Sequence, residues 1–197
     1  MKTELVDVQR RGRDVKVRFP QPPKSGRVPL EATGVAKAYG DNVVFVDVDV
    51  AVERGEHVMI MGLNGAGKTT LLRILAGEET ADLGEVTLGY QTTLGYYAQE
   101  HEQIHAGATV LEHMRRVSGL PDLQLRSLLG HFLLADKVEQ DASTLSGGEK
   151  TKLALAMLMT SRPNVLLLDE PTNNLDPQAK EELLGALMQY QGTIILV

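Results

Sequence analysis

The chain has 197 residues, of which 43% are hydrophobic and 23% charged, a balance that is ordinary for one globular domain with a short appendage. This composition argues against disorder, and the absence of cysteine excludes disulfide scaffolds, thiolate metal sites and cysteine nucleophiles. No apolar run approaches the ~20 residues that span a bilayer, and residues 1–18 lack the apolar stretch of a secretory signal. We therefore expect a cytoplasmic protein without a membrane segment.

The net charge of −6 is unevenly distributed along the chain. Residues 1–30 hold eight Lys or Arg against three Asp or Glu, whereas residues 31–197 hold twelve against twenty-three. An acidic body is poorly suited to nonspecific nucleic-acid binding, which needs cationic patches. The basic beginning of the chain is suited to phosphate contact, but a solvated tail is the commoner role of such a segment.

The first third of the chain predicts strands around a boundary. Alternation favours a short strand over Val15–Phe19, and prolines then exclude a helix up to residue 29. We place a domain boundary there, with a basic, proline-rich linker tail at 1–30 and one domain at 31–197. From Leu30 to Gly55 the pattern is strand-like, with a turn at Gly40-Asp41-Asn42.

The rest of the chain alternates between strand and helix patterns. His57–Met61 predicts a short strand before a glycine-rich loop, and Thr69–Ala76 a helix that ends at Gly77. Glu85–Ala98 is β-rich, and a capping box at Thr109–Glu112 opens a helical insert to about residue 142.

The last third continues this alternation. Val165–Leu168 is apolar throughout, as in a strand covered on both faces, and Asp176-Pro177 opens a helix to about Gln189 before a strand at Thr193–Val197. This order predicts an α/β domain.

The glycine-rich loop has the pattern of a phosphate-binding loop between a strand and a helix. Its glycines let successive N–H groups point into one concavity, and the following helix adds the positive end of its dipole. Lys68 then supplies a mobile charge for the β- and γ-phosphates, and the Thr69 hydroxyl can bind Mg²⁺. The loop consists of Gly62, Leu63, Asn64, Gly65, Ala66, Gly67, Lys68 and Thr69, and Thr70 follows it.

Two acids end the apolar strand. Ligands of open α/β sheets bind beyond the carboxyl ends of the strands, where Asp169 and Glu170 fall. Asp169 is suited to hold Mg²⁺ beside Thr69. On an extended strand the Glu170 side chain points to the opposite face, where it could polarise an attacking water.

A second anion-ready helix end follows from Leu145-Ser146-Gly147-Gly148-Glu149, in which Ser146 and Glu149 form a capping box. Alone it is a well-capped helix. Together with the phosphate loop, Asp169-Glu170 and Pro171-Thr-Asn-Asn-Leu-Asp176, it makes residues ~31–197 resemble the ATP-binding-cassette (ABC) ATPases. The resemblance implies an α/β P-loop NTPase fold with a RecA-like core, a small antiparallel β subdomain and a helical subdomain.

Details of these motifs resemble the ABC-F group. They are Lys150 after the signature, the Asn173-Asn174 pair, and Arg126-Ser-Leu-Leu-Gly130 leading to Phe132. ABC-F proteins carry two cassettes in one chain, joined by a helical linker, and mostly act on the ribosome as translation factors or antibiotic-protection proteins. Residues 1–30 resemble the end of that linker, so we expect the second cassette of a longer protein.

The resemblance also assigns roles. It implies that Tyr39 stacks on adenine, although a locally packed turn tyrosine is an alternative. Gln99 would reach Mg²⁺ and the attacking water, unless it is simply exposed. Asp176 either couples two sites or is an ordinary helix N-cap. The signature residues Ser146, Gly147, Gly148 and Glu149 would contact ATP held by a partner cassette.

Histidines mark a departure and a chance motif. The family's switch histidine has no counterpart among the five histidines, because the chain stops at Val197 inside the matching strand. We therefore expect nucleotide binding to exceed turnover in this chain. His101-Glu-Gln-Ile-His105 fits a zinc-protease pattern, but Gly107 interrupts any helix there and no third ligand is placed.

The combined expectation is binding and hydrolysis of MgATP when two cassettes face each other, with Glu170, Lys68 and Gln99 as catalytic residues and Thr69, Gln99 and Asp169 around Mg²⁺. The partner cassette belongs to the same chain or to a second copy, and the ribosome or its RNA is the expected larger partner. The alternatives are the ATPase subunit of an ABC transporter and a module that closes on ATP without catalytic purpose.

Overall fold

The computed structural model describes residues 17–98, 104–173 and 175–197. Two sheets and the helices that pack against them make up this part of the chain. In chain order the elements are β1 (Leu30–Tyr39), β2 (Asn42–Val52), β3 (His57–Met59), α1 (Lys68–Ala76), β4 (Leu83–Leu88), β5 (Leu94–Tyr97), α2 (Val110–Val117), α3 (Asp122–His131), η1 (Ala142–Thr144), α4 (Gly147–Leu158), η2 (Met159–Ser161), β6 (Val165–Leu168), α5 (Pro177–Met188) and β7 (Thr193–Leu196).

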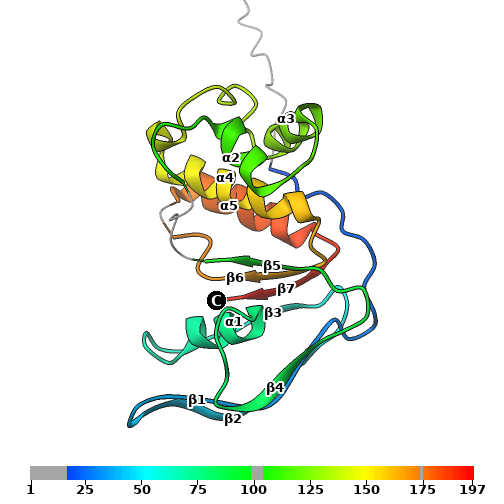
Figure 1. The fold of residues 1–197 in the computed structure, drawn as a ribbon, viewed down its shortest axis with the longest axis vertical. Helices are drawn as coiled ribbons and strands as arrows, with labels where there is room; N and C mark the ends of the chain where they lie inside the picture. The colour runs from blue at the N-terminus through cyan, green and yellow to red at the C-terminus, as the bar shows by residue number, and fades with distance from the viewer. Residues whose placement is uncertain (1–16, 99–103, 174) are drawn as a thin grey trace, which may run out of the picture.

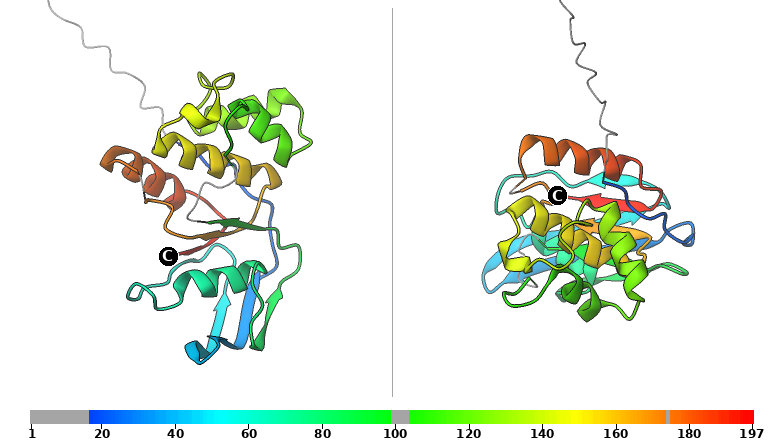
Figure 2. Two further views of the ribbon diagram at one scale, coloured as in Figure 1. Left: turned by 60° about the vertical axis from the view of Figure 1, so that its left-hand side comes forward. Right: turned by 90° about the horizontal axis from the view of Figure 1, so that it is seen from above.

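The elements stack in layers. An antiparallel sheet of order β2-β1-β4 lies at one end, and a parallel sheet of order β3-β7-β6-β5 lies in the middle. Helix α1 lies between the two sheets, whereas α2, α3, α4 and α5 lie on the other side of the parallel sheet (Figure 1; Figure 2, left). This is the predicted α/β architecture with its antiparallel and helical parts.

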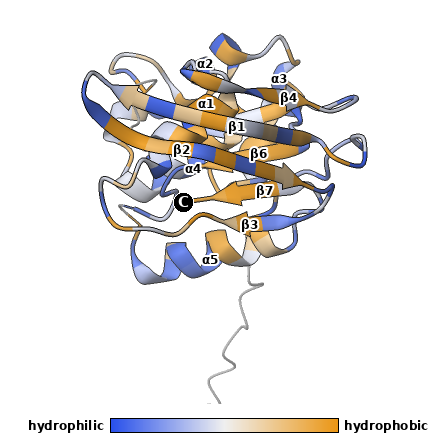
Figure 3. Ribbon diagram, turned by 90° about the horizontal axis from the view of Figure 1, so that it is seen from below, coloured by the Kyte–Doolittle hydropathy of each residue, from blue (hydrophilic) through white to orange (hydrophobic). Residues whose placement is uncertain are grey.

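Strand β6 is the centre of the packing. All four of its residues are fully buried, and its side chains alternate between the two cores on either face of the sheet. Leu166 and Leu168 join the core under α4 and α5, while Val165 and Leu167 join the core around α1. Strands β6 and β7 are hydrophobic along their length (Figure 3), as expected of strands covered on both faces. Asp169, which directly follows the apolar strand β6, therefore lies at the edge of the sheet.

Local sequence signals correctly predicted the end of α1 and the starts of three other helices. Gly77 ends α1 with a left-handed φ of 76°, and Thr109 and Ser146 both form complete capping boxes. Asp176 caps α5 through Ala179 N–H, and Pro177 is the first residue of that helix. Within the described ranges, no helix has both the length and the apolar character needed to cross a bilayer.

Residues 17–29 form no strand, so the strand predicted over Val15–Phe19 is absent from its described part. Val17 and Phe19 are instead buried in the core beside α4 and α5. The Phe19 ring packs edge-on against Phe132 at a centroid distance of 5.3 Å and against Tyr190 at 5.9 Å. The alternation of polar and apolar residues that predicted a strand therefore reflects two buried side chains, Val17 and Phe19, in a segment that is not part of a sheet.

Phe19→Ala is expected to lower the free energy of unfolding by about 3 kcal/mol, because it removes a buried ring and leaves a cavity beside Phe132. Urea unfolding followed by circular dichroism measures the change. Leu123→Ala on α3, at a side chain that is 80% exposed, is the matched control and should stay within about 0.5 kcal/mol. Equal effects of the two substitutions would show that residues 17–29 add nothing to the core.

Candidate functional site

The loop from Gly62 to Gly67 leads from β3 into α1 and exposes its backbone. Gly65 and Gly67 have φ values of 81° and 82°, and Gly67 occupies the N-cap position without any side-chain cap. The first N–H groups of α1 are therefore not capped by a side chain, as an anion site at a helix start requires. The neighbouring side chains of Leu63 and Asn64 face solvent.

Gly67 is required by its surroundings as well as by its φ. A Cβ atom there would lie 2.3 Å from Val44 Cγ1 and 3.1 Å from Phe45 Cδ1, so any side chain would collide with β2. The antiparallel sheet thus packs directly against the loop and fixes its path. This contact joins the antiparallel sheet, which carries Tyr39, to the phosphate loop.

Lys68 lies over the loop that it follows. Its ammonium donates to Gly62 O and Leu63 O, each at 3.0 Å. Among the described residues, no third acceptor bonds to the Lys68 Nζ atom. The lysine therefore sits at the concavity with a donor available to a bound phosphate.

Asp169 is buried at the carboxyl end of β6 with only 1% of its surface exposed. Neither of its carboxylate oxygens has a hydrogen-bond partner among the described residues. Burial raises the pKa of Asp169 above its ordinary value and the Glu170 charge adds to this, while Thr69 and Lys68 act in the opposite direction. The cost of burial thus exceeds the support that Thr69 and Lys68 give to the charged carboxylate, and a bound cation would relieve this cost.

Mg²⁺ fits this arrangement. Carboxylate and hydroxyl oxygens are the hard ligands that it prefers, and Asp169 and Thr69 supply them. The described part of the chain contains no cluster of three or more His, Cys, Asp or Glu residues that could hold a metal. A cation here would therefore take its remaining ligands from phosphate and water, which is usual for Mg²⁺ at nucleotide sites.

Glu170 does not continue the strand, so the prediction that strand alternation orients its side chain is wrong. Strand β6 ends at Leu168, and Glu170 has a left-handed φ of 47°. Its N–H donates to Val197 O at 3.2 Å, and its side chain accepts a hydrogen bond from Asn173 Nδ2. A tight turn closed by the Asn173 N–H bond to Glu170 O at 3.0 Å, rather than the pleat, sets the position of this carboxylate.

The signature residues form the start of α4. Ser146 Oγ accepts from Glu149 N–H at 3.3 Å, and Glu149 Oε2 accepts from Ser146 N–H at 2.8 Å. The Ser146 N–H bond is the main cause of the lowered pKa of Glu149, and Lys137 pairs with the same carboxylate at 3.4 Å. Glu149 is thereby used for capping, whereas Ser146 and Gly147 are exposed.

The phosphate loop and the signature helix lie on opposite sides of the parallel sheet. Figure 1 shows α1 below this sheet and α4 above it. The structure thus groups Lys68, Thr69 and Asp169 in one place and does not bring Ser146 to them. Thr70 belongs to the first turn of α1, next to the loop.

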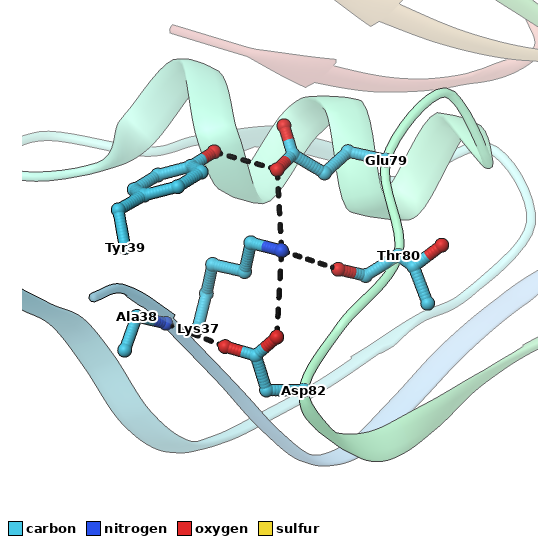
Figure 4. A network of polar contacts seen from close by, with 6 residues as sticks. All are labelled: Lys37, Ala38, Tyr39, Glu79, Thr80 and Asp82. Atoms are coloured by element: carbon cyan, nitrogen blue, oxygen red, sulfur yellow. Dashed lines mark hydrogen bonds and ion pairs between the residues drawn. The ribbon is translucent and has the colours of Figure 1, made fainter.

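Tyr39 stands at the end of β1, before the turn into β2, with 49% of its surface exposed. Its hydroxyl donates to Glu79 Oε1 at 2.6 Å, and Lys37 lies beside its ring (Figure 4). No motif in the sequence pointed to Lys37 or Glu79. Lys37 was detectable, because it lies two residues from Tyr39 on a predicted strand and so on the same face.

Several predictions lie wholly or partly outside the described residues, among them the beginning of the linker tail and Asn174 of the Asn173-Asn174 pair. Gln99 also lies outside them, and its role stays a prediction. Of the zinc-protease pattern only Ile104 and His105 are described, and neither lies in a helix. His113, which the pattern does not include, accepts the His105 N–H at 3.0 Å on its Nε2 atom.

Comparison with known proteins decides the family. Residues 45–173 match the family described as ABC transporter. The chain belongs to this family. Its fold is that of an ABC ATP-binding cassette, and it aligns with a solved inward-facing metal-chelate type ABC transporter at a TM-score of 0.73, over 86% of this chain and 72% of that one, with 24% identity.

Curated relatives of the cassette are longer proteins. "Probable ATP-binding protein YbiT" of Escherichia coli O157:H7 is 40% identical over 185 residues, which cover 92% of this chain and 35% of YbiT. "ABC transporter F family member 5" of Arabidopsis thaliana is 36% identical over 198 residues, covering 98% of this chain and 29% of the plant protein. The chain thus spans about a third of the length of these relatives.

Asp169→Asn is expected to raise the free energy of unfolding of the nucleotide-free chain at pH 7 by about 1 kcal/mol or more, because a neutral amide replaces a buried unpaired charge. Because the pKa of Asp169 is raised in the folded chain, the full gain in the free energy of unfolding is expected only above that pKa, where the folded chain carries the ionised carboxylate. The gain should shrink as the pH falls toward the ordinary value of 3.8.

Urea unfolding between pH 7 and pH 4 measures this gain. Asp136→Asn, at an exposed carboxylate, is the control and should leave stability nearly unchanged. A loss of stability in Asp169→Asn at pH 7 would contradict the argument, since it would mean that the carboxylate is already well partnered.

Proposed function

We propose that this cassette binds MgATP at the loop before α1 and hydrolyses it in an ABC-F protein, where closure of two cassettes acts on the ribosome. The observation that carries the nucleotide site is the buried, unpartnered Asp169 carboxylate in the same site as Lys68 and Thr69. A phosphate-bound cation would supply its missing partner. We place the protein in the cytoplasm.

The protein groups have separate tasks in the proposed reaction. Loop N–H groups and the start of α1 bind the phosphates, and Lys68 neutralises charge that develops on them. Thr69 and Asp169, together with Gln99, would hold Mg²⁺, which neutralises charge on the β- and γ-phosphates. The Glu170 carboxylate accepts a hydrogen bond from the attacking water and orients it.

A second cassette completes the site. The parallel sheet separates the chain's own signature helix from its own phosphate loop (Figure 1). Ser146 and Gly147 are exposed at the start of that helix, so the signature would be available to another cassette. That cassette is supplied by the same polypeptide or by a second copy. Hydrolysis would then depend on closure of the two.

The ABC-F assignment rests on the signature and Asn173-Asn174 motifs and on relatives that carry the F family name. The ATPase subunit of a transporter is the competing proposal. The two differ in the partner that a closed form binds.

Glu170→Gln in the full-length protein should lower kcat for ATP by about 10²–10⁴-fold, because the amide cannot accept the proton of the attacking water. Affinity for ATP should stay within about threefold of the wild type, since the phosphate loop is untouched. Phosphate release and nucleotide titration measure the two quantities. Glu181→Gln, an exposed position on α5, is the control, and wild-type turnover in Glu170→Gln would remove Glu170 from the mechanism.

The same Glu170→Gln variant separates the competing partners. With ATP it should stay closed and co-sediment with ribosomes, whereas without nucleotide it should remain in the supernatant. ATP-dependent recovery with membrane vesicles instead of ribosomes would favour the transporter proposal and contradict ours.

A further inference from the structure

A closed set of polar contacts surrounds Tyr39 on the antiparallel sheet. Figure 4 shows Lys37, Glu79 and Asp82 linking β1 to the segment that follows α1. We call these three residues the Tyr39 brace. Lys37 Nζ lies 3.2 Å from Glu79 Oε1, 3.5 Å from Asp82 Oδ1 and 2.8 Å from Thr80 O. Asp82 Oδ2 in turn accepts the Ala38 N–H at 2.7 Å.

The brace holds its charged groups in one arrangement. The side chains of Lys37 and Glu79 are only 11% and 17% exposed, which is low for an ion pair at a sheet edge. The Tyr39 hydroxyl and the Lys37 ammonium lower the pKa of Glu79, so Glu79 is a carboxylate at neutral pH. Desolvation lowers the pKa of Lys37, but the two carboxylates more than offset this and raise it.

Tyr39 needs such support because of its position. It precedes a turn and is about half exposed, so its ring would otherwise be free to change rotamer. The hydroxyl bond to Glu79, at 2.6 Å, is charge-assisted and fixes one end of the ring. Lys37 Nζ lies over the ring at 5.2 Å from its centroid, which leaves the opposite face for a stacking partner.

The brace is connected to the phosphate loop. Lys37 pairs with Phe45 across β1 and β2, and Phe45 and Val44 pack against Gly67. Lys37 of the Tyr39 brace therefore lies opposite a residue of β2 that packs against the phosphate loop. A ligand held by its phosphates on the loop extends its base from a fixed point next to this hairpin.

We propose that Glu79, held by Lys37 and Asp82, is a positioning residue that orients Tyr39 for the nucleobase and so sets affinity for the base but not for the triphosphate. This inference rests on the proposed nucleotide site. It assigns a role to residues outside the loop and the strand ends. If Glu79 only stabilised the fold, its removal would change the affinity for the nucleotide and the affinity for the triphosphate alike, or would change neither.

Calorimetry on the 197-residue chain with two probes, MgATP and magnesium tripolyphosphate, separates these cases. Glu79→Ala should weaken MgATP binding by about three- to tenfold, because the Tyr39 side chain must then be ordered when the base binds. The affinity for tripolyphosphate, which has no base, should stay unchanged. Tyr39→Phe, which keeps the ring and loses only the hydroxyl, should match Glu79→Ala. The double variant should be no weaker than either single one, because both remove the same bond.

Controls keep the outcomes distinct. Glu78→Ala, at the exposed neighbouring carboxylate, should bind both probes like the wild type, and thermal unfolding shows that each variant is folded. Unchanged MgATP affinity in Glu79→Ala, or an equal loss for both probes, would overturn the inference while leaving the nucleotide site intact. Failure of the wild type to bind either probe would instead overturn the proposed function, and the inference with it.

Discussion

A carboxylate buried without a donor is the constraint on which this cassette is built. Asp169 stands at the end of a strand whose four residues are all fully buried, and neither of its carboxylate oxygens accepts a hydrogen bond from the described residues. Only the nearby Thr69 and Lys68 favour its charged form. An ordinary core would replace such a residue with an apolar one. A cation bound at the proposed site would offset the cost of this charge, and stability and ligand binding would then be linked through this single group.

The parallel sheet determines which parts of the proposed site lie together and which lie apart. It brings Asp169 and Glu170 to the edge beside the loop, because the carboxyl ends of parallel strands share one edge. It also separates α1 from α4, with one core on each face. The start of α4 is capped by its own Ser146 and Glu149 and lies away from the phosphate loop. This layer order supports the proposal that a second cassette completes the site.

Local patterns predicted the elements because local forces determine them. The glycine at the end of α1, the two capping boxes and the Asp176-Pro177 helix start all depend on contacts within about four residues, and all were found. The left-handed Glu170 was not foreseen, because the turn that it enters is set by Val197 and Asn173 as much as by its own strand. Phe19 was misread for the same reason, since its partners are more than 100 residues away along the chain.

The Tyr39 brace shows what such long-range contacts add to a motif. Forty residues separate Tyr39 from Glu79, so no window of sequence contains the pair. The phosphate loop recognises charge through backbone groups that any polyphosphate satisfies, and it cannot by itself distinguish one nucleoside from another. Orientation of a flat ring requires side chains fixed by tertiary structure. In the proposed site, the part of recognition that is shared among phosphate-binding proteins can be read from a motif, whereas the part that concerns the base would depend on how β1 contacts the segment that follows α1.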